Sequence, residues 1–394
     1  MKLRYRIASA VLLVVGVALV AGLIALSYES PCAATPQLPS GTPSMKAFVH
    51  RCYGPPEVLV LEDVAKPIPV DDEVLVKIQA ASVNPIDWHN LRGEPYIMRS
   101  GDGLGAPKNV RLGVDFAGTV EAVGKNVTRF RPGDEVFGGS GRGSFAEYIS
   151  VGEERSIVPK PANLTFEQAA AVPVAALTAL QALRDKGRIQ AGQNVLINGA
   201  SGGVGTFAVQ IAKAFGAEVT GVCSTRNVEM VRSIGADHVV DYTREDFTQG
   251  DQRYDLIIDN VGSHSLLDYR RVLQPDGVVI IVGTTSKGRW TAPFKGAFMA
   301  LVLSPFVSQE AGLMLAQLNP RDLGVLAELM QSGKVTPVID RRYGMREIPE
   351  AIRYLEEGHA RGKVVVSISS DASSPQQTNH RPLDDLAGAA RSAP

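Results

Sequence analysis

An α/β fold, with a doubly wound parallel sheet and a second β-rich region, is predicted for this 394-residue chain by three observations. The stretch 194–215 joins a short apolar run to a glycine-rich turn and then to apolar residues at helical spacing. Further apolar runs alternate with helical segments up to residue 282, which is typical of βαβ units. Between residues 45 and 168, short strand-like runs are broken by Gly and Pro, which indicates a β-rich domain of irregular connectivity.

The stretch 194–215 has the pattern of a dinucleotide-binding turn. Its apolar run Val195–Ile197 is short enough for a buried strand, and the glycines that follow let the backbone approach a pyrophosphate. The N-terminus of the next helix offers unpaired N–H groups to phosphates. Such turns also join strands to helices without any ligand, but the alternation that follows favours a cofactor site. The residues expected to contact the cofactor here are Ser201, Gly202, Gly203 and Val204.

Strands and helices alternate after this turn. The expected strands are Glu218–Val222, His238–Asp241, Tyr254–Asp259 and Gly277–Val282, and the expected helices are Asn227–Ile234 and Ser263–Leu273. Ligands of such sheets bind at the carboxyl ends of the strands. Because Asn260 and Gly283 each follow a strand, we expect both of them beside the cofactor.

The end of the second strand indicates which dinucleotide binds. NAD sites usually place a carboxylate there, on the ribose 2′-hydroxyl. This sequence has Ser224, Thr225 and Arg226 instead, and hydroxyls with a guanidinium suit a 2′-phosphate. The two hydroxyls can also cap the next helix, and the two roles are compatible. We therefore expect NADPH as the cofactor.

Composition excludes several classes of function. The length allows two domains with sizeable cores. A net charge of −1 and an isoelectric point of about 6.6 give no indication of nucleic-acid binding. The three cysteines, at positions 32, 52 and 223, are too few and too scattered for a disulfide framework or a structural zinc site. No metal site is expected.

The N-terminal segment is expected to lie outside the fold. Ile7–Leu26 is about 20 residues without a charge, which is long enough to span a bilayer. It is either an uncleaved membrane anchor, which we favour, or a long signal peptide. Basic residues precede it, so the positive-inside rule places the following domains outside the cytoplasm, away from the supply of NADPH. The side of the membrane stays open, and a start of translation at Met45 would make the protein cytoplasmic.

A series of motifs runs from Met45 to Ile368 in a recognisable order. It comprises AASVNPID at 80–87, GVDFAGTV at 113–120, VGKNV at 123–127, RPGDEVFG at 131–138, FAEY at 145–148, the glycine turn at 199–205, GADHVVDY at 235–242, DNVG at 259–262 and GKVV at 362–365. Together they resemble the medium-chain dehydrogenase/reductase superfamily, in particular its zinc-free quinone oxidoreductase (zeta-crystallin-like) branch. The resemblance covers about four-fifths of the chain, and its specificity comes from the order and spacing of the motifs.

The resemblance implies a GroES-like catalytic domain beside a Rossmann domain, an active site in the cleft between them, and a homodimer. The chain then divides into an anchor or signal at 1–28, a linker at 29–44, the catalytic domain at 45–168 and 306–368, the Rossmann NADPH-binding domain at 169–305, and a disordered tail at 369–394. The apolar segment Trp290–Leu318 is expected in the core, with a substrate pocket, a dimer surface or a membrane contact as alternatives.

The zinc-dependent members of this superfamily use Cys, His, Glu and Cys ligands. The matching positions here hold Asn84, Val114 and Asp115, so no catalytic zinc is expected, and a structural role is expected for Asp115. Without a Lewis acid, hydride addition to a quinone or an enone is easier than reduction of a simple ketone. The acceptor carbon is already electrophilic, and hydrogen-bond donors suffice to stabilise the oxyanion.

Three residues are candidates for the reaction itself. Asn84 matches a family position near the nicotinamide, where its amide would donate to the developing oxyanion; alternatively it is a turn residue before a proline. Asp87 would tune proton delivery, although anchoring of its loop is the more common role. Tyr96 would donate a proton or stack on a ring above the cleft, or simply pack there.

Three more residues are expected beside the cofactor, and the resemblance supplies the first two of them. Thr178 resembles the family threonine beside the nicotinamide, although a helix hydroxyl often bonds its own backbone. Tyr242 matches a position near the phosphates and the adenine. Lys363 lies at the start of the closing strand.

These observations predict an NADPH-dependent, zinc-independent reductase of quinones or α,β-unsaturated carbonyls, in which hydride goes to the electrophilic carbon and solvent supplies the proton. An enoyl-thioester reductase is an alternative, but the basic cluster that a carrier phosphate needs is limited to Arg341 and Arg342. A non-catalytic NADPH-binding protein associated with the membrane is the other alternative.

Overall fold

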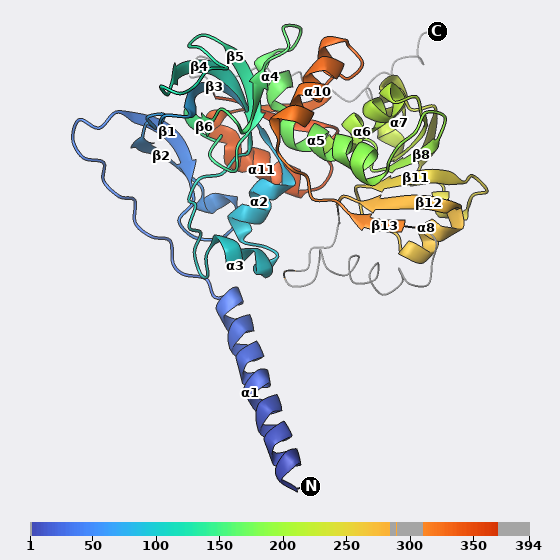
Figure 1. Ribbon diagram of the computed structural model, residues 1–394, viewed down its shortest axis with the longest axis horizontal. Helices are drawn as coiled ribbons and strands as arrows, with labels where there is room; N and C mark the ends of the chain where they lie inside the picture. Colours follow the sequence, from blue (N-terminus) through green and yellow to red (C-terminus); the bar gives the residue numbers. More distant parts are fainter. Residues whose placement is uncertain (1, 284–288, 290–309, 369–394) are drawn as a thin grey trace, which may run out of the picture.

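The computed structural model describes residues 2–283, 289 and 310–368. The expected tail and most of the apolar segment Trp290–Leu318 lie outside the described residues. Two large β-sheets make up the body of the protein, and helix α1 (Lys2–Ser27) extends from that body as a rod (Figure 1).

A six-stranded parallel sheet forms in the second half of the chain, as the alternation of strands and helices predicts. Its strands are β8 (Asn194–Asn198), β9 (Glu218–Cys223), β10 (His238–Asp241), β11 (Tyr254–Asp259), β12 (Leu273–Ile281) and β13 (Glu310–Leu313). They lie in the order β10-β9-β8-β11-β12-β13, and every neighbouring pair is parallel. In this doubly wound order the direction of strand addition reverses between β8 and β11, which is where ligands bind. Through β13 the sheet continues past residue 305.

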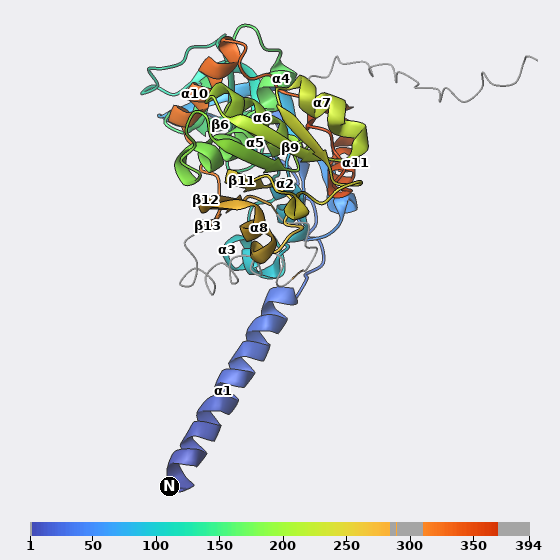
Figure 2. The same ribbon diagram turned by 90° about the vertical axis from the view of Figure 1, so that its right-hand side faces the viewer.

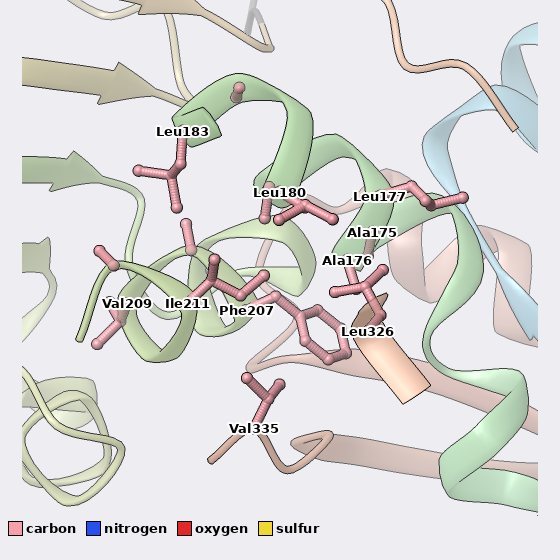
Figure 3. Close-up of a cluster of buried hydrophobic side chains, with 14 of the residues drawn as sticks. Ala175, Ala176, Leu177, Leu180, Leu183, Phe207, Val209, Ile211, Leu326 and Val335 are labelled. Atoms are coloured by element: carbon pink, nitrogen blue, oxygen red, sulfur yellow. The ribbon is translucent and has the colours of Figure 1, made fainter. Parts of the chain in front are cut away.

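Helices cover both faces of this sheet, as the alternating side chains of β8 show. Val195 and Ile197 join one core with α5 (Pro173–Gln181), α6 (Gly203–Ala214) and α10 (Pro320–Gln331). Leu196 joins a second core with α8 (Leu266–Val272). Figure 3 shows the first core, with Phe207 of α6 and Leu326 of α10 among its members. Each large side chain buried in this way contributes about 1.5–3 kcal/mol, so the sheet and α6 form a rigid support for the turn between them.

A seven-stranded sheet forms the β-rich domain. Its strands are β3 (Glu73–Val83), β4 (Asp115–Val123), β5 (Glu135–Gly139), β6 (Tyr148–Gly152), β7 (Ser156–Pro159), β14 (Ile339–Gly344) and β15 (Lys363–Ser367). A separate two-stranded sheet pairs β1 (Ser44–Val49) with β2 (Val60–Ala65). β15 pairs antiparallel with β3, from Val364 opposite Val83 to Ser367 opposite Ala80. The last segment of the chain therefore returns to the first domain, as the resemblance implies.

Residues 166–181 form two helices, α4 (Phe166–Ala170) and α5, with Pro173 as the first residue of α5. Proline lacks the N–H that would continue the first helix, but it fits the first position of the second. The segment between β1 and β2 contains a 3₁₀ helix at Pro56–Val58, and β2 starts at Val60.

Cys32 and Cys52 form a single disulfide, although the cysteine count predicts no disulfide framework. The proline-rich segment after α1 runs back along the β-rich domain, where the Ser30 N–H donates to the Gly105 carbonyl. This path brings the Cα atoms of the two cysteines to 4.6 Å. Nothing in the sequence indicated this pair, because spacing along the chain says nothing about such a return of the chain.

We expect one free thiol in the oxidised protein. Alkylation in denaturant without reductant should label only Cys223, and prior reduction should raise the number of labels to three. In the folded state burial raises the pKa of the Cys223 thiol to about 11, so labelling should require denaturation. Intact-mass spectrometry counts the labels, and three labels without reductant would contradict the disulfide.

Helix α1 spans the N-terminal segment and ends on the loop that carries Tyr96. The buried Arg99 side chain donates to the carbonyls of Leu26 and Tyr28 and pairs with Glu29, which holds the end of α1 against the body. Figure 2 shows the rest of α1 extending away from the body. In the part of the chain that the structure describes, no helix is long and apolar enough to cross a membrane.

Candidate active site

The glycine turn lies where strand addition in the parallel sheet reverses. β8 ends at Asn198 and α6 begins at Gly203, after an N-cap glycine that has no capping side chain. Gly199 has a φ of +76°, and a Cβ on Gly205 would lie 2.1 Å from the Gly199 carbonyl oxygen. The first N–H groups of α6 have no partner within the helix and stay available to an anion. The turn therefore fits the pyrophosphate of a dinucleotide.

Asn260 and Gly283 lie beside this turn, at the carboxyl ends of β11 and β12. The Asn260 Nδ2 donates to the Asn198 carbonyl at 2.9 Å, while its Oδ1 is buried without a hydrogen-bond partner among the described residues. A Cβ on Gly283 would lie 2.5 Å from the Asn260 carbonyl oxygen. Because a buried amide oxygen without a partner is costly, Asn260 stays a candidate to accept a hydrogen bond from the cofactor.

The residues predicted to hold a 2′-phosphate are partly occupied by other contacts. The Thr225 hydroxyl donates to Asp241 at 2.5 Å, so β10 supplies a carboxylate beside the end of β9. This hydrogen bond is the largest of the effects that lower the pKa of Asp241. The exposed Arg226 guanidinium donates to the His359 carbonyl at 3.0 Å, and Tyr242 is 60 % exposed. Thr225, Arg226 and Tyr242 are all exposed, so a cofactor can reach each of them.

Asn227 connects the glycine turn to the end of β9, a role that the sequence analysis missed. Its Nδ2 donates to the Ser201 hydroxyl at 3.1 Å and to the Ser224 hydroxyl at 3.2 Å. Val204 is half-buried against the first core and supports the turn from within α6. No motif marks Asn227, because its role depends on two loops that meet only in the folded chain.

A buried polar cluster lies where β3 leads into α2 (Pro85–Arg92). Asn84 is 1 % exposed, and its Nδ2 donates to Asp115 at 2.9 Å while its Oδ1 accepts from the Lys363 ammonium at 2.5 Å. The Ser82 hydroxyl donates to the same Asp115 oxygen at 2.8 Å, and the Val174 N–H donates to the other at 3.0 Å. Ser82 was not among the sequence candidates, and Asp115 acts here as the common acceptor.

Asp87 lies at the edge of this cluster in the first turn of α2. Its Oδ2 accepts from the Asn84 N–H at 2.8 Å, and its Oδ1 is buried without a partner among the described residues. Burial raises the pKa of Asp87 to about 7. Burial also raises the pKa of Asp115, against the opposite effect of Lys363, and lowers the pKa of Lys363. Three ionisable groups, those of Asp87, Asp115 and Lys363, thus share one buried site.

Lys363 joins the cluster to the glycine turn. Gly362 forms an isolated parallel bridge with Gly202, and the Lys363 Cδ lies 3.3 Å from where a Cβ on Gly203 would stand. The structure therefore brings together the reaction candidates Asn84 and Asp87 and the cofactor candidates of the turn. The β-rich domain and the parallel sheet meet at this point.

The cluster does not fit a zinc ion. The Lys363 ammonium lies 3.6 Å from Asp115, where its charge would repel a metal at the same carboxylate. Among residues 2–283, 289 and 310–368, no group of three His, Cys, Asp or Glu side chains could hold a metal ion.

Tyr96 and Thr178 lie in other surroundings. The buried Tyr96 ring packs 4.4 Å from the Arg99 guanidinium, and its hydroxyl accepts from Arg289 at 3.2 Å. It therefore belongs to the loop that holds the N-terminal segment. The Thr178 hydroxyl donates to the Val174 carbonyl at 2.7 Å, which is the backbone contact that the sequence left as an alternative.

Comparison with known proteins agrees with this architecture. Residues 70–162 match the alcohol dehydrogenase GroES-like domain, and residues 234–366 match the zinc-binding dehydrogenase family. The chain is 36 % identical over 374 residues to the mitochondrial NAD(P)H oxidoreductase RTN4IP1 of Mus musculus, which covers 82 % of this chain and 89 % of that protein. It is also 36 % identical over 358 residues to the 2-methylene-furan-3-one reductase of Solanum lycopersicum, covering 87 % and 84 %.

Two solved structures have the same fold. The quinone oxidoreductase from Coxiella burnetii superposes with a TM-score of 0.72 at 31 % identity, over 83 % of this chain and 100 % of that one. The Escherichia coli quinone oxidoreductase complexed with NADPH gives a TM-score of 0.70 at 25 % identity, over 82 % and 100 %. The fold class and the resemblance are confirmed: the chain belongs to the medium-chain dehydrogenase/reductase superfamily, together with quinone and enone oxidoreductases.

Proposed function

We propose that this protein is an NADPH-dependent reductase of quinones or α,β-unsaturated carbonyls. The observation that carries the proposal is that a single side chain, Lys363, contacts both the buried Asn84 and the glycine turn. Its ammonium donates to the Asn84 Oδ1, and its Cδ lies beside Gly203. Relatives at 36 % identity are named as an NAD(P)H oxidoreductase and a 2-methylene-furan-3-one reductase, which supports the same activity.

Bound NADPH supplies the hydride that adds to the electrophilic carbon of the acceptor. The N–H groups at the start of α6 would hold the pyrophosphate, and Arg226 and Tyr242 would contact the other end of the cofactor. The Asn84 amide donates to the acceptor oxygen as negative charge develops there. Solvent supplies the proton that completes the reduction.

The proposal is tested by the loss of NADPH absorbance with the purified full chain. A small quinone, an alkenal and a simple aldehyde serve as acceptors, with a chelator present and NADH run in parallel. We expect the quinone or the alkenal, and not the aldehyde, to be reduced, and NADPH to be the better donor. Tight NADPH binding without turnover of any acceptor would favour a binding protein, and inhibition by the chelator would indicate a metal site.

We also propose that the folded part matures in an oxidising compartment. The Cys32–Cys52 disulfide supports this location, because disulfides persist where thiols are not kept reduced. The alkylation experiment described above tests this location when it is applied to protein purified from its native cells with thiols blocked at lysis. One label per chain would support an oxidising compartment, and three labels would contradict it. The homodimer stays a prediction.

A further inference from the structure

Lys363 is a buried cation whose contacts differ from those expected of a cofactor residue. Its side chain is 3 % exposed, and its ammonium lies 2.5 Å from the Asn84 Oδ1, 3.5 Å from the Val83 carbonyl and 3.6 Å from the Asp115 Oδ2. The ammonium is therefore engaged within the β-rich domain. Only the alkyl part of the side chain lies against the glycine turn, beside Gly203.

The two charged neighbours determine how the Asn84 amide is oriented. An ammonium can only donate hydrogen bonds, so it requires the amide oxygen on its side. The ionised carboxylate of Asp115 can only accept, so it requires the amide nitrogen. Rotating the amide by half a turn would place its N–H donors against the ammonium and its oxygen against the carboxylate, so that both hydrogen bonds would be lost. One orientation is thus strongly preferred, and it leaves the second N–H of the same amide available as a donor.

We propose that Lys363 and Asp115 are positioning residues for hydride transfer, which hold the Asn84 amide in the single orientation that presents its N–H to the acceptor oxygen. The inference rests on the proposed reductase function and extends it to residues that do not themselves touch the substrate. The Lys363 ammonium also polarises the amide through the hydrogen bond to its oxygen, which strengthens the N–H as a donor.

The bridge between Gly362 and Gly202 also connects Lys363 to the glycine turn. Because the chain pairs with the cofactor turn one residue before Lys363, the position of the ammonium is tied to the position of the turn. Lys363 and Asp115 therefore fix the position of the Asn84 amide relative to a cofactor bound at this turn. A distance error of about 1 Å at a reacting centre is enough to cost about 10²-fold in rate.

The test compares Lys363→Met, Lys363→Arg and Asp115→Asn with Lys334→Met, an exposed lysine on the same C-terminal segment. We expect Lys363→Met to lower kcat about 10²-fold, as for loss of an oxyanion donor, with the KM for the enone and the Kd for NADPH within about twofold of wild type. Lys363→Arg should restore part of kcat, because a guanidinium also only donates. Asp115→Asn should lower kcat because its amide both donates and accepts.

A second readout needs neither substrate nor cofactor. In protein labelled with ¹⁵N-asparagine, the side-chain amide protons of Asn84 should exchange slowly with solvent in the wild type and in Lys334→Met. They should exchange faster in Lys363→Met and Asp115→Asn. If Lys363→Met does not fold, the exchange rates and kcat values of Lys363→Arg and Asp115→Asn are compared with those of the wild type and Lys334→Met.

Two results would overturn the inference. One is weaker NADPH binding with unchanged kcat in Lys363→Met, which would make Lys363 a cofactor-binding residue. The other is unchanged exchange of the Asn84 amide in both Lys363→Met and Asp115→Asn. Absence of turnover in the wild type, with the exchange pattern as expected, would instead contradict the proposed function and leave the orientation of Asn84 established.

Discussion

Replacing Asn84 with alanine is expected to lower kcat about 10²- to 10³-fold with a quinone or enone acceptor, the range found when one donor to an oxyanion is removed. The Asn84 amide donates one N–H to Asp115 and accepts from Lys363 through its oxygen, which leaves its second N–H as a donor for the acceptor oxygen. The KM for the acceptor should change little, because the hydrogen bond strengthens only as charge develops on the acceptor oxygen. Steady-state kinetics at saturating NADPH measures both constants.

The matched control for this variant is Asn126→Ala. Asn126 is an exposed turn residue whose Nδ2 donates to Asp72 at 2.8 Å, so it shares the amide-to-carboxylate contact without lying in the cluster. It should keep the wild-type kcat. A kcat for Asn84→Ala within about threefold of wild type, in a folded protein, would exclude Asn84 as the oxyanion donor and shift the role to backbone N–H groups.

Replacing Gly205 with alanine is expected to damage the fold and cofactor binding together. The added Cβ would stand 2.1 Å from the Gly199 carbonyl oxygen and 2.8 Å from the Ala200 Cα, both backbone atoms that can move only with the turn. Overpacking of this kind costs about 1–3 kcal/mol of unfolding free energy, and we expect the upper end. Displacing a charge-assisted hydrogen bond to the pyrophosphate costs about 1.5–3 kcal/mol, which corresponds to a Kd for NADPH roughly 10- to 100-fold higher.

Gly324→Ala is the control, because Gly324 lies within α10 and a Cβ there meets nothing within 4 Å. Alanine is the better helix former by about 1 kcal/mol, so this variant should be slightly more stable and bind NADPH as the wild type does. Urea unfolding followed by circular dichroism and NADPH titration followed by fluorescence supply the two quantities. A Gly205→Ala protein with wild-type values of both would show that the turn does not have the close packing described here.

The glycine turn between β8 and α6 was predictable from the sequence because its signals are local. Strand β8, the glycines and the apolar face of α6 follow one another within 194–215, and each depends on the chemistry of neighbouring residues. The position of Asn260 and Gly283 was predictable for a related reason. In a parallel sheet every strand delivers its carboxyl end to the same edge, so a residue that follows a strand is placed without knowledge of its partners.

Other features depend on contacts between distant residues. Lys363 and Asn84 are separated by 279 positions, and no pattern in either segment reveals that a lysine ammonium meets that amide. The carboxylate of Asp241 beside Thr225 comes from a neighbouring strand, although the residues that directly follow β9, 224–228, include none. The disulfide between Cys32 and Cys52 likewise depends on a segment that folds back on the body.

The sequence by itself determined the fold class, the family and the glycine turn, because hydrophobic periodicity and glycine conformation act over a few residues at a time. Only the tertiary structure decided that Lys363 and Asp115 hold Asn84 from opposite sides and that Tyr96 packs on Arg99. Hydrogen bonds and ion pairs between buried side chains form only after the sheets have brought the segments together. Their partners are therefore a property of the packed chain.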